Sequence, residues 1–199
     1  MKRTGFSPSA LFSAVPAALC GVVFSCAPWT VVPMEDNPGA APRPAGRFHP
    51  GAYVESIWDE KLAPLARDSA LDLASAPLPA KPAFVRGEGR IARVDSGGRT
   101  GRVLVDLVPG GSGRSVALLT GPVILGSVLR DAAGFLDFSQ FANQLDYAAV
   151  AGELNRRVVE DVVAPRSEFL TPGRTVRFWG GIDPATDPPE IVPVILEVD

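Results

Sequence analysis

The spacing of apolar residues changes along the chain, and the first regular pattern begins after residue 50. Five large apolar side chains recur there at intervals that fit one face of a helix: Tyr53, Ile57, Trp58, Leu62 and Leu65. This periodicity predicts a helical region over residues 51–76, with Trp58 in the core. Pro64 lacks a backbone N–H, so we expect it either to kink this helix or to open a second helix in its first turn.

From residue 83 onward the apolar spacing falls to about two, which is the period of a half-buried β-strand. Two alternating segments flank a turn at residues 95–98, whose sequence Asp-Ser-Gly-Gly favours a β-hairpin. Another apolar run follows the hairpin, so we expect three consecutive antiparallel strands and then two more at the end of the chain. The predicted strands cover residues 84–94, 102–108, 116–119, 175–182 and 191–198.

One long helix is predicted between the third and the fourth of these strands, over residues 147–163. Its apolar stripe repeats every four residues: Val150, Leu154, Val158 and Val162. Asp146 is the expected N-cap, and Pro165 is expected to end the helix. The charged residues of this helix fall mostly off the stripe and are expected to face solvent: Arg156, Arg157, Glu160 and Asp161.

Together these elements predict a single α+β domain over residues 51–199, with a helical part at 51–76 and a β-rich body at 83–199. The order of elements, with one helix before the last two strands, is compatible with a small antiparallel β-barrel or sheet of the OB type. Glycine and proline each supply 20 of the 199 residues. This composition favours a turn-rich β architecture over a helical bundle.

The N-terminal segment has the pattern of a secretory signal peptide, which we predict over residues 1–25. Lys2 and Arg3 form a short basic start, and residues 5–24 carry no charge and are rich in Ala, Val, Leu and Phe. Two prolines interrupt this stretch, and no charged cluster follows it directly. Both features argue against a permanent membrane span.

The four residues that end this leader, Val23-Phe24-Ser25-Cys26, resemble the lipobox of bacterial lipoproteins. The resemblance implies that Cys26 receives a diacylglycerol, becomes the new N-terminus and carries fatty-acyl chains such as palmitate. Cys20 fits the motif less well because a leucine precedes it. In the alternative interpretation, both cysteines are ordinary apolar residues of the leader. The lipobox predicts a protein anchored to the inner or the outer membrane, at the periplasmic face of the cell envelope.

Residues 26–50 are the predicted tether between the lipid and the domain. They contain prolines at short intervals and almost no apolar periodicity, which is typical of an extended linker. His49 lies in this tether and is the only histidine of the chain. A single histidine without partner ligands is expected at the surface rather than at a metal site.

The charge and the rare residues narrow the classes of function. The net charge of −3 and the mixed distribution of charges give no sign of a nucleic-acid partner. Because both cysteines lie in the leader and the histidine in the tether, the domain lacks a thiolate nucleophile, a cysteine-liganded zinc site and the histidine of a serine hydrolase. We therefore expect neither a metal nor a cofactor.

The polar residues between positions 121 and 147 are the best candidates for a binding site. Their side chains could hydrogen-bond sugar hydroxyls, with a tyrosine or a phenylalanine offering a ring face. Alternatively, the arginine pairs internally and the two amides hold loop backbone. The candidates are Arg130, Asp131, Asn143, Gln144 and Tyr147. The apolar residues that precede them are expected in the core: Val123, Ile124, Leu125, Val128 and Leu129.

Short phrases spread over the chain resemble a known family. They include Ala52-Tyr53-Val54, Ile57-Trp58-Asp59, Gly87-Glu88-Gly89, Gly121-Pro122-Val123-Ile124, Leu129-Arg130-Asp131, Asn143-Gln144 and Pro193-Val194. Set after a lipobox, they resemble the predicted periplasmic lipoproteins of domain-of-unknown-function family 2291. The resemblance implies a lipoprotein of unassigned activity, in the context of sugar-uptake transporters of the ATP-binding-cassette (ABC) type.

Three hypotheses of function follow. The first is a lipid-anchored binding or accessory protein without catalytic activity, whose partners are the membrane, a small carbohydrate or components of a sugar transporter. The second is a periplasmic carbohydrate-active hydrolase that uses two carboxylates as acid and base. The third is a structural protein of the envelope. The carboxylates available to the second hypothesis are Asp106, Asp131, Asp137, Asp146 and Glu153.

Overall fold

Five strands close into a barrel in the computed structural model, which describes residues 48–107 and 113–199. The strands are β2 (Ala83–Asp95), β3 (Arg102–Leu107), β4 (Ser115–Leu119), β5 (Thr175–Asp183) and β6 (Glu190–Val198). They follow the order β2-β3-β4-β6-β5, and β2 also pairs with β5 to complete the ring. Only β4 and β6 pair in parallel within the described ring. This is the five-stranded OB arrangement, so the α+β barrel predicted from the order of elements is confirmed.

The long strand β2 makes the closure possible because it serves two neighbours. Its first half, from Ala83, pairs with β5, and its second half, to Asp95, pairs with β3. A register shift between Ile91 and Arg93 bends the strand on the β3 side. Gly89 lies where the two pairings overlap, and a Cβ there would come 2.5 Å from the carbonyl oxygen of Asp106. Only glycine fits such a close approach of backbone to backbone.

The N-terminal helical region consists of α1 (Pro50–Ile57), a π-helical turn (Trp58–Leu62) and α2 (Ala63–Asp68). Pro64 falls in the first turn of α2, the second of the two alternatives expected for it. Trp58 is buried, as its place on the apolar stripe predicts. The helical prediction over residues 51–76 was too long, because the chain leaves the helix at Asp68.

The residues after α2 form an extra strand. Leu71–Asp72 is β1, which pairs in parallel with β2 outside the five-stranded ring. Leu73 follows with its amide donating to the carbonyl of Arg86 at 3.0 Å. Leu71 and Leu73 fit the helical spacing, which made the predicted helix too long. Pairing with β2 places this segment in a strand instead.

The long helix before the last two strands is confirmed as α4 (Gln144–Arg157), continued by a π-helical segment (Val158–Val163) and a 3₁₀ segment (Ala164–Phe169). All four residues of its predicted apolar stripe are buried. The predicted N-cap was wrong: Asn143, not Asp146, caps the helix, and its side-chain oxygen accepts from the Asp146 amide at 2.9 Å. Asparagine and aspartate both suit an N-cap. Because the helix begins at Gln144, Asn143 takes the capping position.

One of the charged residues of α4 is less exposed than predicted. Arg157 keeps 21% of its side-chain surface, and its guanidinium carbon lies 5.2 Å from the ring centroid of Trp58. It also forms ion pairs with Asp59 at 3.5 Å and with Asp161 at 3.2 Å. Arg157 therefore joins α4 to the first π-helical turn, and the prediction that it faces solvent holds only for its neighbours on α4.

The segment between β4 and α4 differs most from the sequence-based expectation. It contains an unpredicted short helix, α3 (Val128–Ala133), and a 3₁₀ turn (Phe138–Gln140). Ile124 and Leu129 are buried as predicted, but Leu125 is 70% exposed, so its assignment to the core was wrong. The reason is a turn at Gly126, whose φ of +90° ends the apolar run before it can continue as a strand.

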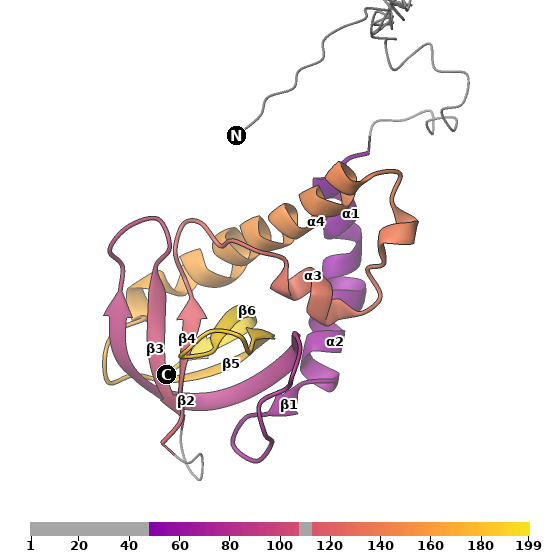
Figure 1. The fold of residues 1–199 in the computed structure, drawn as a ribbon. Coiled ribbons are helices and arrows are strands. Elements are labelled where there is room, and N and C mark those ends of the chain that lie inside the picture. The colour runs from indigo at the N-terminus through magenta and orange to yellow at the C-terminus, as the bar shows by residue number, and fades with distance from the viewer. Residues whose placement is uncertain (1–47, 108–112) are drawn as a thin grey trace, which may run out of the picture. The chain divides into compact units, whose positions relative to one another are not determined.

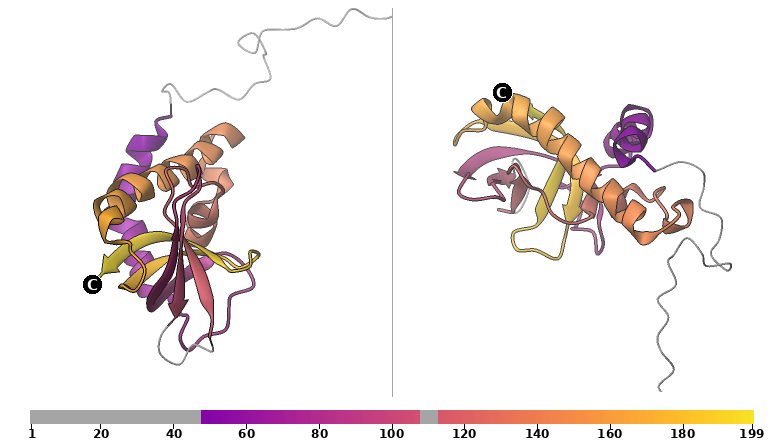
Figure 2. Two further views of the ribbon diagram at one scale, coloured as in Figure 1. Left: turned by 90° about the vertical axis from the view of Figure 1, so that its left-hand side faces the viewer. Right: turned by 90° about the horizontal axis from the view of Figure 1, so that it is seen from above.

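The helices gather around one end and one side of the barrel (Figures 1 and 2). α1 packs against α4, α3 contacts β2 and β5, and the π-helical segment after α4 packs on β6. These contacts place α3 and the start of α4 against each other, which brings the predicted site residues of both into one region.

The predicted signal peptide (1–25), Cys26 and most of the tether lie outside the described residues. Of the tether, the structure describes Phe48, His49 and Pro50; His49 is exposed and Pro50 begins α1. Among residues 48–107 and 113–199, no helix has the length and apolar character needed to span a bilayer.

Candidate functional site

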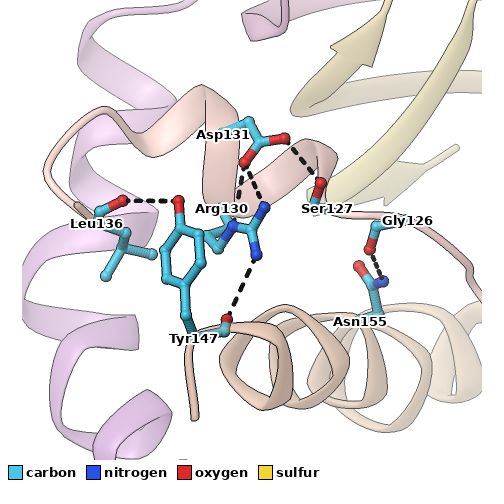
Figure 3. Close-up of polar contacts among 7 residues, drawn as sticks. All are labelled: Gly126, Ser127, Arg130, Asp131, Leu136, Tyr147 and Asn155. Carbon is cyan, nitrogen blue, oxygen red and sulfur yellow. Dashed lines mark hydrogen bonds and ion pairs between the residues drawn. The ribbon is translucent and has the colours of Figure 1, made fainter. Parts of the chain in front are cut away.

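Arg130 is held by internal contacts on several sides (Figure 3). Its Nε and Nη2 atoms donate to one carboxylate oxygen of Asp131 at 3.0 and 2.9 Å, and its Nη1 donates to the Tyr147 carbonyl at 3.4 Å. Its guanidinium carbon lies 3.8 Å from the centroid of the Tyr147 ring. With only 14% of its side chain exposed, Arg130 acts as a link between α3 and α4.

Asp131 connects this link to the start of α3. Its second oxygen accepts from the Ser127 hydroxyl at 2.7 Å, one turn earlier on the chain (Figure 3). The side chain remains 38% exposed and lines a cavity of about 240 Å³ between α3 and the ends of β5 and β6. Asp131 is therefore the predicted site residue with the clearest access to a hollow of the surface.

The two predicted amide residues stand at the start of α4. Asn143 is committed to the helix cap, and its Nδ2 also donates to Asp146 at 2.9 Å. Gln144 is exposed as the first residue of the helix. Of the five predicted site residues, the structure thus brings Arg130, Asp131 and Tyr147 into contact and assigns Asn143 a local structural contact.

A buried amide that the sequence analysis did not single out fixes the loop nearby. Asn155 is 5% exposed, the sole buried polar or charged residue in the described part of the chain. Its Nδ2 donates to the carbonyls of Ile124 at 3.2 Å and Gly126 at 2.9 Å (the latter bond is drawn in Figure 3). These bonds satisfy carbonyls at the point where the chain turns toward α3.

Each carboxylate proposed for acid–base chemistry has a local partner. Asp106 accepts from Ser115 at 2.7 Å, Asp137 from the Ser139 amide at 2.8 Å, and Glu153 from Arg156 at 2.7 Å. Asp146 accepts from Asn143, and Asp131 from Arg130. Hydrogen bonds from Ser139, first from its side chain and then from its backbone, lower the pKa of Asp137 below the ordinary value.

The cavity beside Asp131 holds two further carboxylates that the sequence analysis missed, Asp183 and Glu190. Both are engaged: Asp183 accepts from the Ala185 amide at 3.0 Å, and Glu190 pairs with Arg102 at 3.3 Å. In the described part of the chain, no group of three or more His, Cys, Asp and Glu side chains has a metal-binding arrangement.

A second hollow lies on the outer wall of the barrel, where β1, β2 and β5 meet. It is an open groove of about 300 Å³, lined by Trp179 together with Asp72, Ala74, Arg86, Gly87, Glu88 and Arg177. Strand register sets its walls, because Arg86 lies opposite Trp179, and Glu88 lies opposite Arg177. The groove thus combines one partly buried indole with guanidinium and carboxylate groups.

Neighbouring charges hold the walls of this groove in place. Arg67 of α2 lies over the Trp179 ring, with 5.8 Å between its guanidinium carbon and the ring centroid. Arg86 pairs with Asp72 at 3.1 Å, and Arg177 pairs with Glu197 at 3.3 Å. Glu88 forms no ion pair within residues 48–107 and 113–199.

The sequence carried a signal for this groove that its analysis passed over. In the predicted strand at residues 175–182, Val176 and Phe178 face the core, so the alternation places Arg177 and Trp179 on the outer wall. A tryptophan on the polar face of a strand is the unusual feature, because large aromatic side chains are normally buried.

A comparison with one solved structure agrees with the fold. A crystal structure of an OB-fold protein from Thermotoga maritima superposes with a TM-score of 0.60 at 20% sequence identity, over 77% of this chain and 100% of that chain. An OBody bound to hen egg-white lysozyme gives a TM-score of 0.36 at 17% identity, over 66% and 94% of the two chains. The Stn1–Ten1 complex of S. pombe gives 0.33 at 15% identity, over 71% and 78%. No curated protein matches the sequence.

The family assignment rests on the body of the chain. The family described as "Predicted periplasmic lipoprotein (DUF2291)" matches residues 80–197, which cover the whole barrel from just before β2 almost to the end of β6. This match confirms the resemblance seen in the short phrases of the sequence. The chain therefore belongs to the DUF2291 family of predicted periplasmic lipoproteins.

Proposed function

We propose that this lipoprotein is a non-catalytic binding module, anchored through lipid on Cys26 at the periplasmic face of the envelope, whose barrel binds a small carbohydrate. The observation that carries the proposal is the groove around Trp179 on the outer wall of the barrel. Its volume of about 300 Å³ is at the lower end of the range for small-ligand sites, and it suits one or two sugar rings rather than a long chain.

The chemistry of the groove supports a sugar better than other small ligands. The face of a pyranose ring is apolar and packs on an aromatic ring, and Trp179 offers such a ring. Sugar hydroxyls both donate and accept, and the groove supplies guanidinium donors from Arg86 and Arg177 and carboxylate acceptors from Asp72 and Glu88. Because these charges nearly balance, a neutral sugar fits the groove better than a phosphorylated one.

The local contacts of the carboxylates considered as acid or base fit a binding protein without catalytic activity. All five that were considered as acid or base have a hydrogen bond or an ion pair to a near neighbour, so their geometry serves local structure. A glycosidase needs two carboxyl groups about 5 to 10 Å apart across a cleft with a sugar between them. The Trp179 groove contains Asp72 and Glu88, but Asp72 is paired with Arg86.

The family resemblance, which implies a context of sugar-uptake transporters, suggests a physiological setting. A lipid-anchored module that holds a sugar at the membrane surface would raise its local concentration near an ABC-type transporter. We therefore propose transporter components as protein partners. The third hypothesis, a structural envelope protein, becomes the better one when no sugar binds.

The test is a thermal-unfolding series on the full chain in detergent solution with glucose, galactose, ribose, xylose, maltose and glucose 6-phosphate. A ligand at a hundred times its dissociation constant adds about 2.7 kcal/mol to the free energy of unfolding. We expect this stabilisation with at least one neutral sugar and a weaker effect with glucose 6-phosphate. No shift with any of these compounds contradicts the small-sugar proposal.

Variants locate the binding site. Trp179→Ala and Glu88→Gln are expected to lose most of the sugar-dependent shift, since the first removes the ring and the second replaces a charged carboxylate oxygen by an amide donor. Phe169→Ala is the matched control because Phe169 is an exposed aromatic residue, 50% accessible, that does not line the groove. A shift that survives in both groove variants shows that the sugar binds elsewhere.

The anchor is tested separately. We expect Cys26→Ser to abolish labelling by radioactive palmitate and to release the chain from membranes, whereas Cys20→Ser retains both. Equal behaviour of the two variants contradicts lipidation at Cys26.

A further inference from the structure

Five aromatic rings pack together at one end of the domain, which we call the aromatic tip. Phe48, Tyr53 and Phe141 contact one another with centroids 5.6 to 5.7 Å apart, and Phe141 continues to Tyr147 at 5.4 Å. Phe138 meets Tyr147 edge-on at 5.6 Å. The tip joins the start of α1, the 3₁₀ turn and the first turns of α4, which lie together in Figure 1.

This end of the domain also exposes large apolar side chains. Phe138 is 49% accessible although its ring is held against Tyr147, and Leu145, in the first turn of α4, is 81% accessible. Phe138 is thus fixed in an outward position by the 3₁₀ turn and by the ring beneath it. Two exposed apolar side chains at the rim of an aromatic cluster are suited to contact with another apolar phase.

The position of the tip along the chain indicates that this apolar phase is the lipid bilayer. Phe48 is the first described residue and is itself part of the tip, so the chain leads from this end of the domain toward Cys26. Residues 27–47 lie between them, and a chain of that length spans at most roughly 75 Å when extended and about 25 Å on average as a flexible coil. The tether therefore leaves the domain at the tip, so a bilayer that holds the lipid on Cys26 lies within reach of it.

We propose that the aromatic tip docks on the surface of the bilayer that carries the lipid anchor, with Phe138 and Leu145 entering the interface. This inference rests on the proposed lipidation of Cys26. Aromatic side chains favour the boundary between headgroups and acyl chains, and Phe138, packed on Tyr147, would enter that boundary. Docking would fix the orientation of the barrel above the membrane.

The charges at the tip define which lipid surface it suits. Asp137 and Asp146 flank the exposed side chains, and Arg130 is covered by Tyr147 and Asp131. The tip therefore offers no basic patch for anionic headgroups, and apolar burial alone drives the contact. Docking on phosphatidylcholine should then be at least as strong as docking on a surface that contains phosphatidylglycerol.

The experiment places a fluorescent probe at the tip of the full lipidated chain in vesicles. Phe138→Trp and Leu145→Trp each add an indole at the proposed contact, and Phe169→Trp adds one outside the tip, at a site as exposed as Phe138. Phosphatidylcholine brominated in its acyl chains quenches an indole that enters the interface. We expect it to remove most of the added emission of the two tip variants and little of that of Phe169→Trp.

Three results overturn the proposal. The first is equal quenching in all three variants, which indicates general proximity of the domain to lipid. The second is blue-shifted emission of Phe138→Trp without quenching, which indicates contact with a second copy or with another protein. The third is quenching that requires phosphatidylglycerol. Flotation of the vesicles separates these outcomes from failure of the anchor: a chain that does not float contradicts lipidation of Cys26, whereas one that floats unquenched contradicts docking of the tip.

Discussion

The guanidinium of Arg130 lies over the ring of Tyr147, with 3.8 Å between its central carbon and the ring centroid. The same arginine donates to the backbone carbonyl of Tyr147 and pairs with Asp131. A planar guanidinium can stack and form a two-pronged contact at the same time, which an ammonium group cannot do. Arg130 therefore fastens the short helix α3 to the start of α4, next to the aromatic tip.

Replacing Arg130 is expected to lower the free energy of unfolding, because its contacts are internal. Arg130→Ala removes the stacking on Tyr147 and the pair with Asp131, and we expect a loss of about 1–3 kcal/mol in the free energy of unfolding. Arg130→Lys should restore only part of this loss. Urea titration of the full chain in detergent, followed by circular dichroism, measures both.

Arg156→Ala is the matched control, because this arginine on α4 is 53% exposed and forms its ion pairs with Glu153 and Glu160 on the same helical segment. Such surface pairs contribute little, so we expect a change within about 0.5 kcal/mol. Equal stability of Arg130→Ala and Arg156→Ala would show that Arg130 is dispensable for the fold. The interpretation of Arg130 as a binding residue would then regain support.

Asn155 gives a second prediction because its amide is buried with two carbonyl partners. Asn155→Ala leaves the carbonyls of Ile124 and Gly126 without their donor, and we expect a loss of about 2 kcal/mol. Asn155→Asp should cost more, since a carboxylate offers no donor to these oxygens. Hydrogen exchange in the segment 123–131 should speed up in both variants, whereas the exposed substitution Gln144→Ala should leave it unchanged.

The barrel could be predicted from the sequence because parts of β2, β3 and β5 alternate between buried and more exposed positions, and because the order of the elements is compatible with an OB barrel. The long helix was equally legible, since Val150, Leu154, Val158 and Val162 form one stripe. The prediction was less accurate where two nearby residues suited the same position. Asn143 and Asp146 both suit an N-cap, and only the structure shows which residue takes that position.

The groove and the apolar run before α3 show why the site was harder to predict. Trp179 was placed on a predicted strand, but recognising a groove requires β1 and α2 beside it, and both are joined to β2 and β5 by contacts distant in sequence. Leu125 was assigned to the core by its apolar neighbours, although the turn at Gly126 leaves it exposed. The spacing of apolar residues predicts the buried face of a helix or strand. It does not predict a bend between two elements that depends on tertiary hydrogen bonds, such as those of Asn155.

Asp137 provides a prediction about pH. Hydrogen bonds from the side chain and then the backbone of Ser139 lower the pKa of Asp137 below its usual value of 3.8, because they favour the charged carboxylate. A group whose pKa is lowered in the folded state stabilises that state fully above its unfolded pKa, and the contribution disappears as the pH falls through the folded pKa. Asp137→Ala should therefore be less stable than the parent at pH 7, and this difference should become smaller as the pH falls through the folded pKa.

A carbon-13 NMR titration of the aspartate side chains measures the pKa directly. Ser139→Ala removes the larger of the two causes but keeps the backbone N–H that donates to Asp137 at 2.8 Å. The pKa of Asp137 should then rise toward 3.8 without reaching it. A pKa at or above the usual value in the parent chain would show that the 3₁₀ turn is not capped in solution. Phe138, the next residue, would then lose the fixed outward position on which docking of the aromatic tip depends.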